Sequence, residues 1–191
     1  MIYVVATLTV KPEMRAEFIA GAIACIAETR KEAGNIAYDM HESVTDHAKM
    51  VFVEQWENAE ALVPHRAAED RDHYAGQSRH PLIKEKEPGE NFMIYVVATS
   101  QVKPESRDAF IKGAKECIAA TRKEKGCLSY DSHTSINDPN LFVVVERWES
   151  REDLNAHGRA PHMKVWREYS APLKVSPTVI EIVSDGMVET L

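Results

Sequence analysis

The sequence predicts an α+β fold built from two ferredoxin-like modules carried on one chain. The first observation is a tandem repeat, because the letters MIYVVAT occur at residues 1–7 and again at residues 93–99. A shift of 92 positions aligns residues 1–65 with residues 93–157 without a gap, and 37 of these 65 positions are identical. The second observation is the order of segments, which in the second copy follows the β-α-β-β-α-β pattern. A repeat of this length matches a small domain rather than a solenoid unit.

Each copy begins with a strand and a helix. Residues 2–10 read IYVVATLTV, and such β-branched and aromatic residues favour a strand. Pro12 and Glu13 then suit the first turn of a helix, because proline has no N–H to satisfy there and an acid complements the helix dipole. We expect this helix to end near Glu32, with Gly34 as its C-cap. Its apolar stripe has the helical period, at Phe18, Ala22, Cys25 and Thr29.

The middle of each copy predicts a hairpin and a second helix. Residues 35–43 and 49–57 have strand patterns, and the connection in the second copy is the turn sequence Asn-Asp-Pro-Asn at residues 137–140. Asn58 and Ser150 suit the N-cap of the following helix, because their short side chains accept hydrogen bonds from its first N–H groups.

The two copies differ beyond the aligned region. The second copy finishes with TVIEIV at residues 178–183, a clear strand pattern, whereas the first has a highly charged segment broken at Pro88-Gly89. We therefore expect a first module over residues 1–80 whose last strand is weak or missing. A linker over residues 81–92 and a complete second module over residues 93–191 should follow.

The open sheet face of each module needs a cover. A ferredoxin-like module lays its helices on one face of its sheet, and an exposed apolar second face would be an aggregation hazard. Two modules on one chain can close this face by packing sheet to sheet at high effective concentration. We therefore expect a pseudo-dimeric α+β barrel with space between its sheets, and further homo-oligomers are compatible with it.

The composition indicates a globular protein of the cytoplasm. A formal net charge of −7 provides no basic surface for nucleic acid or an anionic membrane. We expect no signal peptide and no membrane span, because the chain has neither a charged-then-apolar leader nor a long apolar run. The three cysteines are an odd number without metal-site spacing, which favours a reducing compartment.

Cofactor motifs are absent from the sequence. There is no glycine-rich phosphate loop, nucleophile elbow or dinucleotide fingerprint. His157 and His162 are five residues apart with a proline between them, whereas a helical metal site commonly places its ligands at i and i+4. We therefore expect neither a cofactor nor a metal. The protein would then either catalyse a reaction in which the substrate itself supplies the reactivity, or bind a small molecule without converting it.

The hairpin strands carry polar side chains that a wholly apolar core would not contain. A carboxylate among valines, as at Glu54 and Glu146, needs a partner or water. It either faces solvent or pairs with the hairpin histidine for structural reasons, or it belongs to a polar lining of the inter-sheet cavity with histidine as acid or base. The hairpin set comprises Tyr38, His41, Glu54 and Trp56 in the first copy and Tyr130, His133, Glu146 and Trp148 in the second.

A second group of candidates follows the hairpin. His65 and His157 are equivalent by the repeat, and His162 and Trp166 come after them in the second copy. Trp166 either lines a pocket for an aromatic ligand or simply packs the second helix.

These motifs resemble those of the antibiotic biosynthesis monooxygenase family. In the second copy they are Y-D-S-H at residues 130–133, F-V-V-V-E-R-W-E-S at 142–150, L-x-x-H at 154–157 and P-H-M at 161–163. The first copy matches through V-F-V-E-Q-W-E at residues 51–57. The resemblance implies ferredoxin-like modules that dimerise into a barrel with the helices outside.

The resemblance also implies a set of activities. Family members include cofactor-independent oxygenases that oxidise phenols or quinols to quinones, haem-degrading enzymes, and enzymes acting on a small signalling sugar derivative. The haem-degrading members typically carry an asparagine in the first strand. They also carry an iron-binding histidine about ten residues beyond the position equivalent to His157. Here Ala6 and Ala98 occupy the first position and Arg167 the second, which disfavours haem degradation.

We therefore expect a cofactor-independent monooxygenase that uses molecular oxygen to oxidise a phenolic or quinol-type small molecule. His133 or His157 would be the base, and Glu146 would orient a histidine or the substrate. The alternative is a small-molecule-binding or stress-associated module without turnover, suggested by the incomplete first copy. The substrate-binding set would be Tyr130, Trp148, His162 and Trp166, with Tyr38, His41, Glu54, Trp56 and His65 in the first copy.

Overall fold

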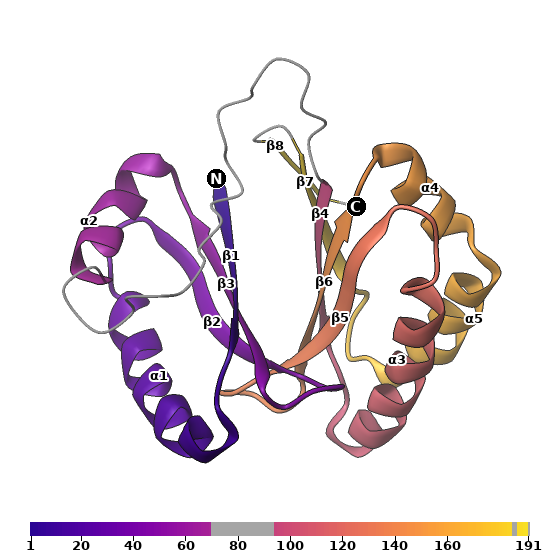
Figure 1. Cartoon of the computed structure of the whole chain (residues 1–191), viewed down its shortest axis with the longest axis horizontal. Helices are drawn as coiled ribbons and strands as arrows, with labels where there is room; N and C mark the ends of the chain where they lie inside the picture. Colours follow the sequence, from indigo (N-terminus) through magenta and orange to yellow (C-terminus); the bar gives the residue numbers. More distant parts are fainter. Residues whose placement is uncertain (70–93, 185–186, 191) are drawn as a thin grey trace.

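The computed structural model describes residues 1–69, 94–184 and 187–190 and confirms the α+β architecture of two related modules. Figure 1 shows two halves whose strands face each other and whose helices lie on the outside. The first half contains β1 (Ile2–Thr9), α1 (Arg15–Thr29), β2 (Asn35–Ser43), β3 (Lys49–Trp56) and α2 (Ala59–Glu69), with the 3₁₀ turn η1 (Pro12–Met14) before α1.

The second half repeats this order and extends it. The second helix predicted from the sequence is two helices, because Ala160 adopts an extended conformation before Pro161 and so interrupts the helix. A short strand also follows the predicted last strand. The elements are β4 (Ile94–Gln101), η2 (Pro104–Ser106), α3 (Arg107–Thr121), β5 (Cys127–Ser135), β6 (Leu141–Trp148), α4 (Arg151–Arg159), α5 (Pro161–Ser170), η3 (Ala171–Leu173), β7 (Val179–Ser184) and β8 (Met187–Thr190).

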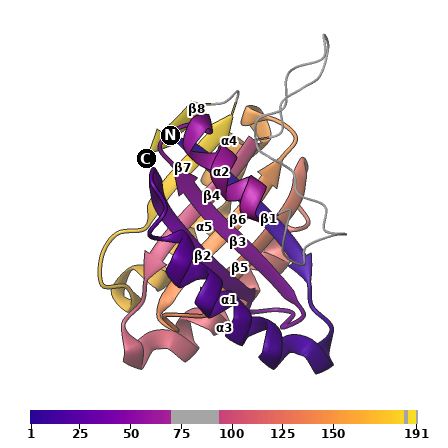
Figure 2. The same cartoon turned by 90° about the vertical axis from the view of Figure 1, so that its left-hand side faces the viewer.

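All described strands belong to one sheet, in the order β1-β3-β2-β5-β6-β4-β7-β8. The halves meet where β2 pairs antiparallel with β5, with His41 opposite Ser135 and Ser43 opposite His133. The sheet curls at this junction into a half-barrel, so the two modules are joined edge to edge and also face each other (Figure 1). Figure 2 shows α1 and α2 lying across the outer face of the first half.

The expected sheet-to-sheet packing is present. A buried cluster between the halves combines Val5 and Val53 of the first half with Val97 and Val145 of the second. Two further clusters lie between the sheet and the helices, one in each half, around Trp56 and Trp148. The molecule therefore has four layers in the order helices, sheet, sheet and helices, with one buried cluster between each pair of neighbouring layers.

Side chains alternate between the two faces of each strand. In β6, Val143 and Val145 pack in the cluster between the halves. Phe142 and Trp148 belong instead to the cluster beneath the helices. This alternation decides which polar residues lie between the two halves and which lie beneath the helices. Residues that are close in the sequence can therefore lie on opposite faces of the sheet.

Polar side chains tie the β2–β5 junction together. The Ser43 hydroxyl donates to Asp131 Oδ2 at 2.8 Å, and the Ser135 hydroxyl donates to Asp39 Oδ2 at 2.6 Å. Each aspartate thus receives a hydrogen bond from the other module. Within its own module, each also pairs with an arginine and a histidine: Arg30 and His41 lie 3.4 and 3.6 Å from Asp39, and Arg122 and His133 lie 3.2 and 3.9 Å from Asp131.

The expected weak last strand of the first module and the linker over residues 81–92 fall almost wholly on residues 70–93, outside the described residues. The module boundaries at residues 80 and 93 therefore stay predictions. Among the described residues, no helix combines the length and apolar character needed to cross a membrane.

Removing the crossed hydrogen bonds should destabilise the junction. We expect Ser43→Ala and Ser135→Ala each to lower the free energy of unfolding by about 1–3 kcal/mol, because each removes one hydrogen bond that a buried or half-buried carboxylate receives from the other module. Thr45 and Asn137 still donate to Asp131 and Asp39 in these variants. Urea denaturation measures this. Ser129→Ala, on β5 but outside the crossed pairs, is the control, and an unchanged midpoint in both junction variants would contradict the assigned role.

Candidate active site

Two equivalent polar clusters lie between the sheet and the helices, one in each half. In the second half, the Trp148 indole N–H donates to Glu146 Oε2 at 2.8 Å, and the rings of Trp148 and His157 are 4.8 Å apart. In the first half, the Trp56 indole donates to Glu54 Oε2 at 2.9 Å, and its ring is 4.8 Å from His65. The repeat therefore preserves a spatial constellation as well as a sequence.

The local sequence explains how this cluster is built. Glu146 and Trp148 are two residues apart on a strand, so both side chains point to the helix-facing side and the indole reaches the carboxyl. On α4, Leu154 and His157 are three residues apart and share the inward face. The Ser150 hydroxyl accepts a hydrogen bond from the Asp153 N–H at 3.1 Å, which confirms the predicted N-cap that starts this helix.

A cavity of about 880 Å³ opens beside the second cluster, between the sheet and α3, α4 and α5. Glu146, Tyr130 and His157 line its polar end. The volume suits a small organic molecule of several rings. Most of the remaining wall is apolar and includes Val96, Ala98, Phe110, Val144, Ile180 and Ile182.

His157 has the arrangement of a general base. It is 4% exposed, and its Nδ1 lies 2.7 Å from Glu124 Oε2. An ionised carboxylate only accepts hydrogen bonds, so the proton sits on Nδ1 and leaves the Nε2 lone pair available. Among the described residues, Nε2 has no hydrogen-bond partner. Burial lowers the pKa of His157 although Glu124 opposes this shift, so the ring is neutral near pH 7.

Glu146 is the second titratable group of the polar end. Burial raises the pKa of its carboxyl to about 7, while the hydrogen bond from Trp148 works against that rise. Both protonation states are therefore populated near neutral pH. Tyr130 differs, because burial first and the charge of Glu146 second raise the pKa of its phenol well above its ordinary value. Tyr130 thus stays a neutral hydroxyl that can donate.

Glu124, His157 and His162 place possible metal-binding atoms within 4.8 Å of one another. One carboxylate and two imidazoles form a donor set that zinc accepts. The 2.7 Å separation of His157 Nδ1 and Glu124 Oε2 is nevertheless that of a charge-assisted hydrogen bond. Two ligands about 2.1 Å from a tetrahedral ion would stand more than 3 Å apart. The described arrangement fits a hydrogen-bond network better than a metal site.

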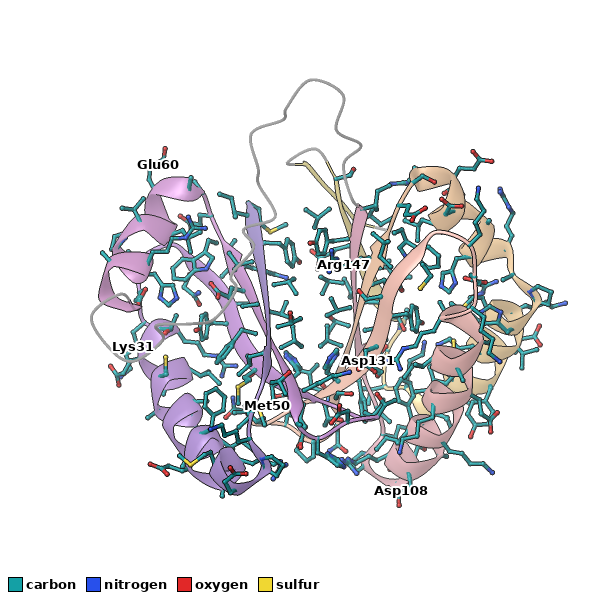
Figure 3. The ribbon with its side chains drawn as sticks, viewed as in Figure 1. Lys31, Met50, Glu60, Asp108, Asp131 and Arg147 are labelled. Carbon is teal, nitrogen blue, oxygen red and sulfur yellow. The ribbon has the colours of Figure 1, made fainter. Side chains whose placement is uncertain are left out.

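The structure does not bring His133 to Glu146 and His157. His133 lies on the opposite face of the sheet, in a cavity of about 640 Å³ between the two halves, together with Asp131 and Arg147. Figure 3 shows Asp131 and Arg147 on the inner side of the second half. Residue parity on β5 and β6 causes this separation, because His133 and Tyr130 are an odd number of positions apart.

His41 and His133 belong to the junction between the modules. Burial lowers the pKa of each to about 4, although Asp39 and Asp131 oppose the shift. Both rings are therefore neutral near pH 7, next to the crossed serine–aspartate hydrogen bonds.

The other predicted site residues either line the 880 Å³ cavity or pack against the histidines of the two polar clusters. Trp166 lines the 880 Å³ cavity and also packs edge-on against Phe110, with ring centroids 5.0 Å apart, so both sequence interpretations describe it. His162 lies beside His157, 5.9 Å between ring centroids, and its Nε2 is 3.1 Å from the Thr121 hydroxyl. In the first half, the Tyr38 ring lies 5.3 Å from the His65 ring.

Sequence reasoning missed Glu124 and Lys174. Glu124 holds His157, and the equivalent Glu32 lies 3.1 Å from His65 Nδ1. The available signal was the identical Lys-Glu pair at residues 31–32 and 123–124, which stands 33 positions before the histidine in both copies. Lys174 lines the far end of the cavity from an irregular segment, and no repeat or period marks it.

Comparison with known proteins places these observations in a family. The model of the family described as antibiotic biosynthesis monooxygenase matches residues 1–76 and 93–169. "Putative monooxygenase YcnE" of Bacillus subtilis is 31% identical over 91 residues, covering 45% of this chain and 96% of that protein. "Probable quinol monooxygenase YgiN" of Escherichia coli is 30% identical over 86 residues, covering 40% of this chain and 83% of that protein.

A solved structure is also similar to part of this chain. "Putative antibiotic biosynthesis monooxygenase from Nitrosomonas europaea" is 25% identical, with a TM-score of 0.48, and covers 50% of this chain and 91% of that one.

The buried Glu146 should make stability depend on pH. Its folded-state pKa of about 7 exceeds the ordinary 4.5, so the folded protein holds the proton more tightly than the unfolded chain between these values. This contribution is present at low pH and is lost as the pH rises toward 7. We expect Glu146→Gln to remove a decline of about 3 kcal/mol in the free energy of unfolding between pH 5 and pH 8.

Urea denaturation across this pH range measures the decline. Glu149→Gln, an exposed glutamate three positions further on, is the control. Parallel pH profiles for the wild type and Glu146→Gln would contradict the assigned protonation.

Proposed function

The chain belongs to the antibiotic biosynthesis monooxygenase family, and from this premise we propose that it oxidises a phenolic or quinol-type small molecule with molecular oxygen, without a cofactor, in the cavity of its second half. The observation that carries the proposal is the buried His157, whose Nε2 lone pair has no partner among the described residues and which lines an apolar cavity. The name printed for YgiN, a quinol monooxygenase, supports the substrate class.

His157 is the proposed base. Glu124 accepts the Nδ1 proton and fixes the ring, so that Nε2 can take the proton of a substrate hydroxyl. Removing that proton raises the electron density of the aromatic ring. The imidazolium that forms lies beside the Glu124 carboxylate, whose negative charge stabilises it.

Glu146 and Tyr130 orient the substrate. The indole of Trp148 holds Glu146 Oε2, which leaves the other carboxyl oxygen to bind a substrate hydroxyl. Tyr130 lines the same end and stays neutral, so its hydroxyl can donate to the developing quinone oxygen.

The chemistry balances with oxygen as the only oxidant. The phenolate passes one electron to O₂, and the resulting superoxide and substrate radical combine at a ring carbon bearing hydrogen. The O–O bond then breaks: one oxygen atom stays on that carbon as the quinone carbonyl, and the other leaves as water with two hydrogens from the phenol. The apolar wall keeps bulk water from the phenolate and the radical pair.

The first half favours a second candidate function, small-molecule binding without turnover. It carries the same Glu-Trp-His cluster, yet Met40 and Phe52 stand in its core where the second half has Ser132 and Val144. The Phe52 ring lies 5.5 Å from the Tyr38 ring. A polar cluster enclosed by bulkier side chains has a structural role. If the cluster around Trp148 in the second half has the same role, the protein binds a small molecule without converting it.

Exchanging the two equivalent histidines for alanine separates the two functions. We expect His157→Ala to lower kcat/KM for quinol oxidation at least 100-fold, because it removes the base. His65→Ala is the matched control and should leave the rate within a few fold. Oxygen consumption and quinone absorbance under air, with a panel of quinols and hydroxyanthracenes, measure the rate.

Two results would count against the oxygenase. If the wild type oxidises none of the panel between pH 6 and 8 but binds its members, the binding module is correct. If both alanine variants keep the wild-type rate, His157 is not the base. A chelator should leave the rate unchanged.

Removing the partner of His157 should move the pH dependence. Glu124 raises the pKa of His157, so Glu124→Gln should lower it further and shift the acidic limb of kcat/KM to lower pH. The plateau rate should fall about tenfold or more, because a weaker base accepts the proton less readily. The matched Glu32→Gln, in the first half, should leave the profile in place. An acidic limb that does not move in Glu124→Gln would contradict the proposed pairing.

A further inference from the structure

The charges around the 880 Å³ cavity are unequal. Four cationic side chains line it, whereas Glu146 is the one acidic residue among its described lining. Glu146 lies at the polar end with His157 and is engaged by Trp148. The rest of the lining therefore combines apolar surface with net positive charge. The four cations are Arg151, Arg159, Arg167 and Lys174.

Lys174 is the cation best placed to bind a ligand. Its Nζ donates to the Thr178 hydroxyl at 2.7 Å, and that hydroxyl lies 2.8 Å from the Ser100 hydroxyl. All three residues line the cavity. Among the described residues, Lys174 forms no ion pair, unlike Lys125 and Lys164, which lie 3.5 and 3.9 Å from acidic oxygens. Burial alone lowers the pKa of Lys174, as expected for a half-buried cation without an acidic neighbour.

Two of the three arginines, Arg159 and Arg167, are less suited to this task. Arg167 donates from Nη1 to the Gly158 carbonyl at 3.0 Å and is exposed. Arg159 is also exposed, at the end of α4. Solvent screens charges in such positions, so they raise the positive potential near the cavity without fixing a ligand.

The strand register gives the distance between the two polar ends. Val96 of β4 is opposite Glu146, and Ser100 lies four residues further along the same strand. Thr178 lies next to Ser100, because the adjacent pair is Thr99 with Val179. Four residues of a strand extend about 13 Å. Two fused aromatic rings with polar groups at opposite ends, plus a hydrogen bond at each end, span a distance of this order.

We propose that the cavity selects an elongated aromatic phenol that carries an acidic group at the end remote from the oxidised hydroxyl, with Lys174, Thr178 and Ser100 binding the acidic group. The inference rests on the proposed function in taking this cavity as the substrate site. A carboxylate is the simplest such group: Lys174 supplies the positive charge, and the two hydroxyls supply further donors. The hydroxyl to be oxidised then lies at Glu146 and His157.

A pair of matched phenols tests the inference without turnover. The probes are 2-naphthol and 6-hydroxy-2-naphthoate, which differ by one carboxylate placed opposite the hydroxyl. Calorimetric titration under nitrogen measures the affinity of each. We expect the wild type to bind the carboxylate about tenfold more tightly, as a charge-assisted hydrogen bond allows. Lys174→Met keeps the aliphatic stem and should abolish this preference while leaving 2-naphthol binding unchanged.

Two further variants make the test specific. Lys174→Arg should keep most of the preference, which excludes general damage to the cavity. Lys164→Met makes the same chemical change on the exposed face of α5 and should keep all of it. Equal affinity of the wild type for both probes, or an undiminished preference in Lys174→Met, would overturn the inference.

Turnover distinguishes this inference from the proposed function. The same variants are assayed under air with 1,4-dihydroxynaphthalene and its 6-carboxylate. If neither is oxidised but Lys174 sets the preference in the binding experiment, the acid-binding end stands and the oxygenase fails. If both are oxidised with equal KM and Lys174→Met changes neither KM, the oxygenase stands and the acid-binding end fails.

Discussion

The pairing of β2 with β5 is the constraint on which the rest of the structure depends. Three opposed residue pairs join two sheets that would otherwise be separate, and the crossed serine–aspartate hydrogen bonds fix their register. The curl at this junction brings the valines of both inner faces together. It also leaves the helices on the outside, where each half builds its own polar cluster. The repeat makes this geometry symmetric, because each module offers the same strand edge to the other.

Strand alternation divides the polar residues of the hairpin into two groups with different tasks. His41 and His133 point inward, stay neutral near pH 7 and lie beside the aspartates that bridge the modules. Glu146 and Tyr130 point outward, toward the helices, and meet His157 there. The first group lies at the junction between the modules, and the second provides titratable groups next to the 880 Å³ cavity. A histidine and a glutamate of one hairpin thus belong to opposite sides of the same sheet.

The two halves show how one constellation acquires different surroundings. Both keep a tryptophan that donates to a glutamate and a histidine held by a second glutamate. In the second half, Val144 lines the cavity beside the cluster, and α5 and η3 extend the wall to Lys174. The proposed chemistry follows from this space and from the charge at its far end. The polar cluster by itself does not distinguish a catalytic centre from a structural one.

The sequence alone determined the two-module architecture, the element order up to the end of the repeat, and the list of candidate residues, because repeats, periodicity and capping residues are local signals. It also reached the family, through motifs that lie on the two hairpin strands and the two following helices of the second copy. Only the tertiary structure decided which candidates meet. His133 and His157 were equal candidates until residue parity placed them on opposite faces of the sheet. Glu124 and Lys174 reach the site from segments 33 and 17 positions away from His157, and their roles depend on how helices pack on the sheet, which no local pattern encodes.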